Sequence, residues 1–145
     1  MTILTHSGQS ILLYGWRRND NELRRFRRAY IQIARKNGKT FFSSGVGLYD
    51  LMSEPGAEVY SAATKHDQAM RCFADAKSSV KYSKTFKKYI TMLAHALTFR
   101  DGKMTALSSD SKTLDGLNPS CAIIDEYHAH KTDELLNVIE SGMSS

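Results

Sequence analysis

The most informative stretch of the sequence is Ala34-Arg35-Lys36-Asn37-Gly38-Lys39-Thr40, which ends in Gly-Lys-Thr. This tripeptide closes the Walker A pattern of phosphate-binding loops, in which a strand leads into a loop and the loop opens a helix. Backbone N–H groups at such a helix start form a concave site for anions. A glycine also lets the backbone approach the phosphates closely. The stretch therefore predicts a phosphate-binding loop over residues 33–40.

The residue types in this loop predict separate roles. Lys39 is expected to bind the β- and γ-phosphates of a nucleotide as a point charge, and the Thr40 hydroxyl to ligate Mg²⁺. Arg35 is placed to stabilise charge that develops on the γ-phosphate, although it could equally pair with a carboxylate. Ile33 occupies the position of the first glycine in the pattern, so a basic loop at a helix start stays an alternative. The predicted nucleotide-binding residues are Arg35, Lys36, Asn37, Gly38, Lys39 and Thr40.

A second motif is an apolar run that ends in two carboxylates, Cys121-Ala122-Ile123-Ile124-Asp125-Glu126. Continuous apolar runs of this kind are typical of strands buried on both faces of a parallel sheet. The run resembles a Walker B strand, in which Asp125 is expected to hold Mg²⁺ and Glu126 to orient and deprotonate the attacking water. Adjacent residues of a strand point to opposite sides, so the two carboxylates can take separate roles. The alternative is a strand that ends in solvated acids.

The rest of the chain alternates between strand-like and helix-like patterns. This alternation predicts an α/β domain with a mainly parallel sheet flanked by helices. Ligands bind such sheets at the carboxyl ends of the strands, which is where both motifs lie. The predicted strands are 30–34, 58–63, two within 90–108 around a turn at 100–103, and 121–124. The predicted helices are 38–52, a second one that contains residues 70–80, and 132–141.

Helical spacing of apolar residues predicts which sides of the first two helices face the core. In the helix over 38–52 these residues are Phe41 or Phe42, Val46, Tyr49 and Met52. In the following helix they are Met70, Phe73, Ala76 or Lys77, and Val80.

Composition restricts the class of protein further. The chain has 145 residues, enough for one domain with one core, so a single domain is expected over 1–145. No apolar run approaches the roughly 18–20 residues that cross a bilayer, and the first residues lack the features of a signal peptide. Cys72 and Cys121 are too few for a disulfide framework. These features favour a cytoplasmic protein.

The net charge is +5, and much of the excess lies in an early arginine cluster. Such a cluster attracts polyanions, and the alternative is a solvated face. Aromatic residues among the arginines are predicted to pack in the core rather than to stack on bases. The arginines are Arg17, Arg18, Arg24, Arg25, Arg27 and Arg28, and the aromatic residues are Tyr14, Trp16 and Phe26. His128 and His130 form a His-x-His pair, for which Mg²⁺ at the neighbouring carboxylates is a better explanation than a separate metal site.

Together these stretches resemble the ATPase domain of phage terminase large subunits, the ATPases that pump DNA into procapsids. The resemblance runs from about residue 11 to about residue 143. Terminases often lack the first glycine of the loop and carry an arginine early in it, as this chain does at Ile33 and Arg35. Besides the two motifs, the carriers are Tyr14-Gly15-Trp16-Arg17, Val59-Tyr60-Ser61-Ala62-Ala63-Thr64, Leu107-Ser108-Ser109-Asp110-Ser111-Lys112, Gly116-Leu117-Asn118-Pro119 and Tyr127-His128-Ala129-His130.

The resemblance implies a P-loop NTPase fold of the RecA-like type, with an additional strand and a catalytic glutamate. It implies Mg²⁺-dependent ATP hydrolysis that powers translocation of viral DNA into procapsids, in the cytoplasm of a host bacterium. Glu126 and Arg35 would be catalytic, and Thr40 and Asp125 would hold Mg²⁺. The implied cofactors are ATP and Mg²⁺. The implied partners are double-stranded DNA, a portal, a small terminase subunit and further copies in a ring, with no membrane.

The resemblance also implies that the chain is part of a larger protein. It is expected to be a partial ATPase domain, with the phosphate loop at 33–40, the Walker B strand at 121–126, and without the nuclease domain of the family. Two other interpretations stay open. One is a nucleic-acid-binding module or an inert, truncated prophage remnant, without catalysis. The other is a helicase-like P-loop ATPase, which would need a second motor domain.

Overall fold

The computed structural model describes residues 14–22, 25–34, 36–63, 65–108, 117–125 and 134–143. The chain divides into two compact units, Met1–Lys39 and Thr40–Ser145. Within these described ranges, no helix has both the length and the apolar character that a membrane crossing requires.

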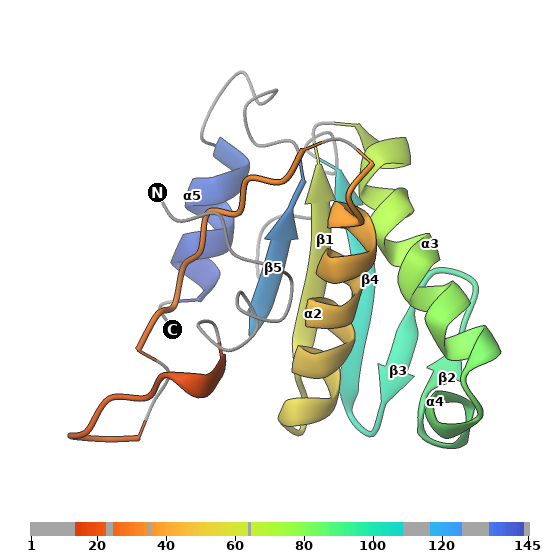
Figure 1. The fold of residues 1–145 in the computed structure, drawn as a ribbon, viewed down its shortest axis with the longest axis horizontal. Helices are drawn as coiled ribbons and strands as arrows, with labels where there is room; N and C mark the ends of the chain where they lie inside the picture. The colour runs from red at the N-terminus through yellow and green to blue at the C-terminus, as the bar shows by residue number, and fades with distance from the viewer. Residues whose placement is uncertain are drawn as a thin grey trace. The chain divides into compact units, whose positions relative to one another are not determined.

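The larger unit is built on a five-stranded sheet with the order β2-β3-β4-β1-β5 (Figure 1). Its centre is parallel, because β1 pairs in parallel with both β4 and β5. Antiparallel strands β3 and β2 extend the sheet beyond β4. This arrangement confirms the predicted α/β class and the strands predicted at 58–63 and 121–124. The two strands predicted within 90–108 are β3 and β4, and the short β2 was not predicted. The strands are β1 (Glu58–Ala63), β2 (Thr91–Met92), β3 (Leu97–Phe99), β4 (Gly102–Ser108) and β5 (Cys121–Ile124).

Helices cover both faces of this sheet. On one face, α2 and α3 contribute Leu51 and Phe73 to a buried cluster that also contains Val59 of β1. On the other face, Ile139 of α5 packs with Ala62 of β1. The two strand residues lie on opposite faces because successive side chains of a strand alternate. The helices are α2 (Lys39–Ser53), α3 (His66–Tyr82), α4 (Lys84–Tyr89) and α5 (Glu134–Gly142).

The buried side of α2 differs in part from the predicted one. Of the predicted positions, Phe41 and Tyr49 are 67% and 53% exposed, so the prediction is wrong for these two. The alternative Phe42 and Val46 are half-buried, and Met52 packs against the core cluster. The helix instead buries Ser44, Gly47, Leu48, Asp50 and Leu51. The helix lies close to the sheet at Gly47, where an added Cβ would lie 2.8 Å from Met104 Cε and 3.1 Å from Ile123 Cδ1. Small residues on this side therefore let the helix backbone come close to the sheet.

The buried side of α3 agrees with the prediction. Phe73, Ala76 and Val80 are fully buried, and Met70 packs against their cluster. A polar contact adds to this seating, because the buried Ser61 hydroxyl on β1 donates a hydrogen bond of 2.9 Å to the Ala69 carbonyl.

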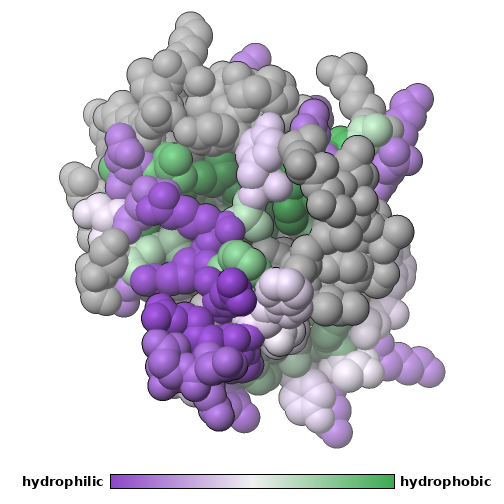
Figure 2. All heavy atoms as spheres, turned by 60° about the vertical axis from the view of Figure 1, so that its left-hand side comes forward, coloured by the Kyte–Doolittle hydropathy of each residue, from purple (hydrophilic) through white to green (hydrophobic). Residues whose placement is uncertain are grey.

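The smaller unit contains the early arginines and its own aromatic pair. The Trp16 and Phe26 rings lie 6.0 Å apart, and the Arg25 guanidinium is 5.7 Å from each ring centroid. Trp16 and Phe26 are 47% and 41% exposed, so the prediction that they pack in the core is wrong. Two arginines make local contacts: Arg18 pairs with Asp20 at 2.8 Å, and Arg17 donates to a backbone carbonyl. Figure 2 shows a continuous hydrophilic area over this part of the chain.

Residues 30–34 do not form the predicted strand. Ile31 and Ile33 are half-buried and alternate with the exposed Gln32 and Ala34, as in a strand. However, no strand of the described chain pairs with this segment. A strand exists only where a neighbour completes its ladder of hydrogen bonds, so the alternation alone was insufficient.

Candidate functional site

The predicted phosphate loop has an unusual backbone. Lys36 and Gly38 have positive φ angles of 64° and 74°. Glycine adopts this left-handed region freely, whereas a side chain such as that of lysine is strained there. Residues with alternating backbone handedness turn successive N–H groups toward one side and form anion-binding nests. Strain of this kind gathers at ligand-binding sites, where the rest of the structure maintains it.

A helix begins directly after this turn. Helix α2 starts at Lys39, so Thr40 lies in its first turn, where the backbone N–H groups have no partner within the helix. The side chains of Lys39 and Thr40 are both half-buried. The predicted order of loop and helix start is therefore present in the described residues, although the strand before them is not.

The second motif lies at the carboxyl end of the parallel strands. Strand β5 ends at Ile124, and the next residue, Asp125, donates its backbone N–H to the Ala62 carbonyl of β1 at 2.9 Å. This bond extends the ladder by one residue and fixes where the Asp125 carboxylate leaves the sheet. The side chain of Asp125 is half-buried.

The start of α2 and the end of β5 lie at the same end of the larger unit, at the carboxyl end of the parallel strands. Figure 1 shows α2 beginning at the edge to which the arrows of β1 and β5 point. Further along the helix, Gly47 lies close to β5, because a Cβ added there would be 3.1 Å from Ile123 Cδ1. Thr40, in the first turn of α2, and Asp125, directly after β5, thus belong to parts of the fold that lie at the same end of the parallel strands.

Several predicted residues lie outside the described ranges. Arg35 and Glu126, the two predicted catalytic residues, are among them, as are His128 and His130. The polar segment 109–116 is also outside them. The roles assigned to these residues stay predictions.

The larger unit contains two cysteines. Cys72 of α3 is buried and Cys121 of β5 is half-buried, and neither cysteine forms a disulfide. Burial raises the pKa of the Cys72 thiol to about 11, and the negative charge of Asp125 contributes in the same direction. The thiol is therefore protonated at neutral pH and acts as a small core residue rather than as a nucleophile.

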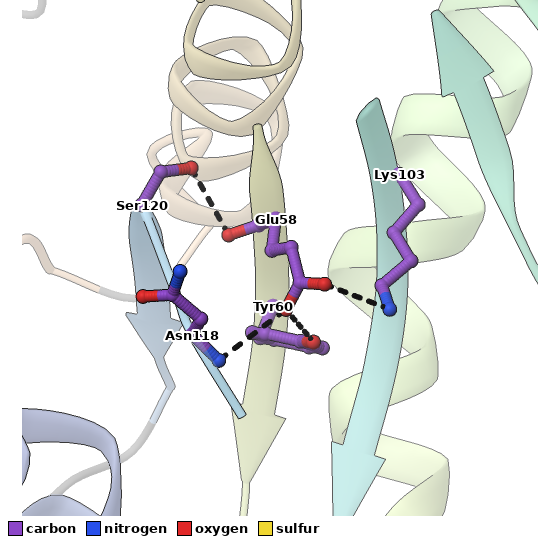
Figure 3. Close-up of polar contacts among 5 residues, drawn as sticks. All are labelled: Glu58, Tyr60, Lys103, Asn118 and Ser120. Carbon is purple, nitrogen blue, oxygen red and sulfur yellow. Dashed lines mark hydrogen bonds and ion pairs between the residues drawn. The ribbon is translucent and has the colours of Figure 1, made fainter. Parts of the chain in front are cut away.

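A polar network that the sequence patterns did not predict lies at the amino end of β1 (Figure 3). The Glu58 carboxylate accepts hydrogen bonds from the Tyr60 hydroxyl at 2.7 Å and from the Asn118 backbone N–H at 3.4 Å. Its other oxygen lies 3.0 Å from Lys103 Nζ. The Glu58 carbonyl accepts from the Ser120 backbone N–H and hydroxyl at 2.9 and 3.1 Å. Glu58 therefore joins β4, β1 and the segment that enters β5.

This network shifts the ionisation of its members. Burial alone would raise the pKa of Glu58, but the hydrogen bonds from Tyr60, Lys103 and Asn118 outweigh burial and lower the pKa below its ordinary value of 4.5. Burial, followed by the hydrogen bond to Glu58, raises the pKa of the Tyr60 hydroxyl. The ionised carboxylate is thus the form that the folded chain favours.

Glu58→Gln is expected to lower the free energy of unfolding by about 1 kcal/mol near neutral pH, because the ion pair with Lys103 is lost. A carboxylate with a lowered folded-state pKa stabilises the fold above its unfolded pKa, and this contribution disappears as the pH falls through the folded value. The difference between wild type and variant should therefore shrink below pH 4.5. Urea unfolding at about pH 7 and about pH 3 measures it.

Glu54→Gln is the matched control, because this carboxylate is exposed and makes no polar contact within the described residues. It should change stability little at either pH. A loss in Glu58→Gln that is the same at both pH values would contradict the role of the ionised carboxylate.

The fold and the loop together define a class. A parallel α/β sheet, a left-handed turn that opens a helix, and an acidic residue at the end of a neighbouring strand are the features of a P-loop domain. Comparison with known proteins agrees. The family model "Terminase large subunit, ATPase domain" matches residues 6–145. The chain belongs to this family.

A solved structure supports the same assignment. The large terminase of bacteriophage HK97 is similar, with 27% sequence identity and a TM-score of 0.71. The likeness covers 79% of this chain and 26% of the HK97 chain, so this chain spans about a quarter of that protein. No curated protein matches the chain.

Proposed function

We propose that the chain binds ATP with Mg²⁺ through residues 33–40 and supplies the ATP-hydrolysing part of a terminase large subunit. The observation that carries this proposal is the backbone of the loop. Lys36 and Gly38 are both left-handed, and α2 begins at the next residue. Two left-handed residues directly before a helix start suit a nest of N–H groups around phosphates, and strained residues of this kind cluster at ligand-binding sites.

The side-chain types of the two motifs suit a nucleotide with its metal ion. Lys39 would neutralise the β- and γ-phosphates, and the N–H groups of the first turn of α2 would bind their oxygens. The Thr40 hydroxyl and the Asp125 carboxylate are hard oxygen ligands of the kind that Mg²⁺ prefers, with Asp125 acting directly or through water. When bound, the ion would neutralise charge on the phosphates as the bond to the γ-phosphoryl group breaks.

Two further residues would complete the chemistry. Glu126 would orient a water molecule and take its proton as the water oxygen attacks the γ-phosphorus, while the bond to the β-phosphate oxygen breaks. Arg35 would stabilise the charge on the transferred group. The adjacency of Asp125 and Glu126 after an apolar strand supports this division, because neighbouring side chains of an extended chain point to different sides.

The family supports a wider role for the parent protein. ATP hydrolysis would power movement of double-stranded DNA into a procapsid, in the cytoplasm of a host bacterium. Partners would be a portal, a small terminase subunit and neighbouring copies in a ring. In such a ring, a neighbour could supply a further arginine to the site.

Thermal unfolding with and without Mg²⁺–ATP tests the binding step. ATP at about 100 times its Kd is expected to stabilise the wild-type chain by roughly 2.7 kcal/mol. Lys39→Ala should remove this stabilisation, because its ammonium would hold the phosphates. Glu126→Gln should retain it, because this residue would act in hydrolysis rather than in binding.

Lys84→Ala is the matched control, since it removes an exposed lysine at the far end of the sheet. It should respond to ATP as the wild type does. No response of the wild-type chain, or a response that survives in Lys39→Ala, would overturn the proposed site.

A further inference from the structure

We propose that a second basic surface, formed by the carboxyl end of α3 and by α4, binds the phosphate backbone of double-stranded DNA. Its exposed lysines, called here the lysine face, are Lys81, Lys84, Lys87 and Lys88. The sequence from Ala76 to Arg100 contains no aspartate or glutamate, so no acidic residue in this stretch balances the four ammonium groups. A concentration of one sign of charge attracts a polyanion.

The ammonium groups of the lysine face are not neutralised by acidic side chains of the described fold. Within the part of the chain that the structure describes, none of its four lysines forms an ion pair. Other basic residues are used differently. Lys103 pairs with Glu58, and Lys77 donates to the Leu93 and Ala94 carbonyls at 3.0 and 3.1 Å. Lys77 therefore closes the turn between β2 and β3, and the lysine face is left for an external partner.

The packing of α4 sets the direction of these side chains. Its only residue packed against the buried core is Phe86, among those the structure describes. The helix is capped by Ser83, whose hydroxyl oxygen accepts a hydrogen bond from the Phe86 backbone N–H at 3.2 Å. With Phe86 directed inward, Lys84, Lys87 and Lys88 are exposed. Residues three and four apart are neighbours on a helix surface, so these ammonium groups form one row.

Two exposed tyrosines extend this surface. Tyr82 and Tyr89 are 80% and 51% exposed. The Lys81 ammonium lies 5.6 Å from the Tyr82 ring centroid, and that of Lys88 lies 5.5 Å from Tyr89. These cation–π contacts restrict the lysine side chains near the surface. Tyrosine hydroxyls and lysine ammonium groups are both common donors to DNA phosphates.

The position of the lysine face separates it from the nucleotide site. Helix α3 begins after the carboxyl end of β1 and runs back along the sheet, so α4 lies at the end opposite the β1 and β5 arrowheads (Figure 1). Binding at this surface therefore requires no contact with Thr40 or Asp125. The two activities can be tested independently.

The choice of DNA among polyanions rests on the proposed function, in which the parent protein moves DNA. The residue types agree with this choice. Lysine is a flexible point charge without the fork geometry that reads bases or carboxylates, and phosphate contacts carry no sequence information. A protein that moves along DNA of any sequence needs contacts of this kind.

DNA binding at several salt concentrations tests the proposal. Fluorescence anisotropy with a labelled duplex would compare the full chain with Lys84→Gln/Lys87→Gln, because neither side chain makes a polar contact within the described residues. Loss of two phosphate contacts should weaken binding about tenfold or more near 0.1 M salt, and should reduce the slope of log K against log salt by about 2. Lys84→Arg/Lys87→Arg should retain binding.

The matched control is Lys65→Gln/Arg71→Gln, which removes the same charge from exposed positions near the other end of α3. Its loss of affinity for DNA should be less than half of the loss expected for Lys84→Gln/Lys87→Gln. Equal losses in both double variants would show a response to net charge only and would overturn the site, as would unchanged binding in Lys84→Gln/Lys87→Gln. Competition by polyglutamate as effective as that by DNA would overturn the assignment to DNA.

The response to Mg²⁺–ATP separates this proposal from the preceding one. Lys84→Gln/Lys87→Gln should keep the wild-type stabilisation by ATP, and its unchanged melting temperature without ligand would show that it folds. If ATP fails to stabilise any form while DNA binding still depends on the lysine face, the nucleotide site is wrong and the DNA surface stands.

Discussion

Phe73→Ala is expected to lower the free energy of unfolding by about 3–5 kcal/mol, the largest effect of a single substitution considered. Phe73 is fully buried and lies in the cluster that joins α3 to Val59 and Met104 of the sheet. Truncation removes the ring from this cluster and leaves a cavity that close-packed neighbours fill only in part. Urea unfolding followed by circular dichroism measures the loss.

Phe41→Ala is the matched control for this substitution. Phe41 is also a helical phenylalanine, but it is 67% exposed, so its truncation should change stability by about 0.5 kcal/mol or less. Similar losses in the two variants would contradict the seating of α3 on the sheet through Phe73.

Gly47→Leu is expected to destabilise the fold by about 1–3 kcal/mol, because the new side chain would force α2 away from the sheet. An added Cβ alone would approach Met104 Cε to 2.8 Å and Ile123 Cδ1 to 3.1 Å. Since Ile123 lies two residues before Asp125, the same displacement should weaken the proposed response to Mg²⁺–ATP. Thermal unfolding with and without the nucleotide measures both effects.

Gly45→Leu offers a close comparison within the same helix. A Cβ at Gly45 would have no atom within 4 Å, so only the higher helix propensity of leucine acts there. This variant should be as stable as the wild type or more stable by up to about 1 kcal/mol. Destabilisation of both variants by the same amount would show that close packing at Gly47 does not position α2.

The predictable part of the fold depended on local patterns. The apolar run before Asp125 correctly predicted β5, and the tripeptide that ends at Thr40 correctly predicted a helix start. The spacing of Phe73 and Val80 correctly predicted the buried side of α3. In each case a few neighbouring residues carry the signal, either through hydrophobic periodicity or through a short motif. The family that these motifs indicated is confirmed.

The remaining features depend on groups that are distant in the sequence or on small residues. Gly47 and Ser44 carry no hydrophobic signal, so they were not predicted to be buried, whereas the exposed Phe41 and Tyr49 were. The Glu58 network joins residues from three separate segments. The left-handed backbone of Lys36 has no local signature, because lysine rarely adopts it. Residues 30–34 alternate as a strand does, but local sequence cannot supply a partner strand.

The order of the strands also has a consequence for how the chain folds. All fully buried members of the cluster beneath α2 and α3 come from residues 48–104, whereas the opposite face requires Ile139. Contacts between residues close in the sequence form at a lower entropic cost, so the first cluster should assemble during synthesis before β5 has emerged. Strand β5 then adds to the preformed edge of β1. Asp125 would therefore reach its place only after α2 and the central strands are already in position.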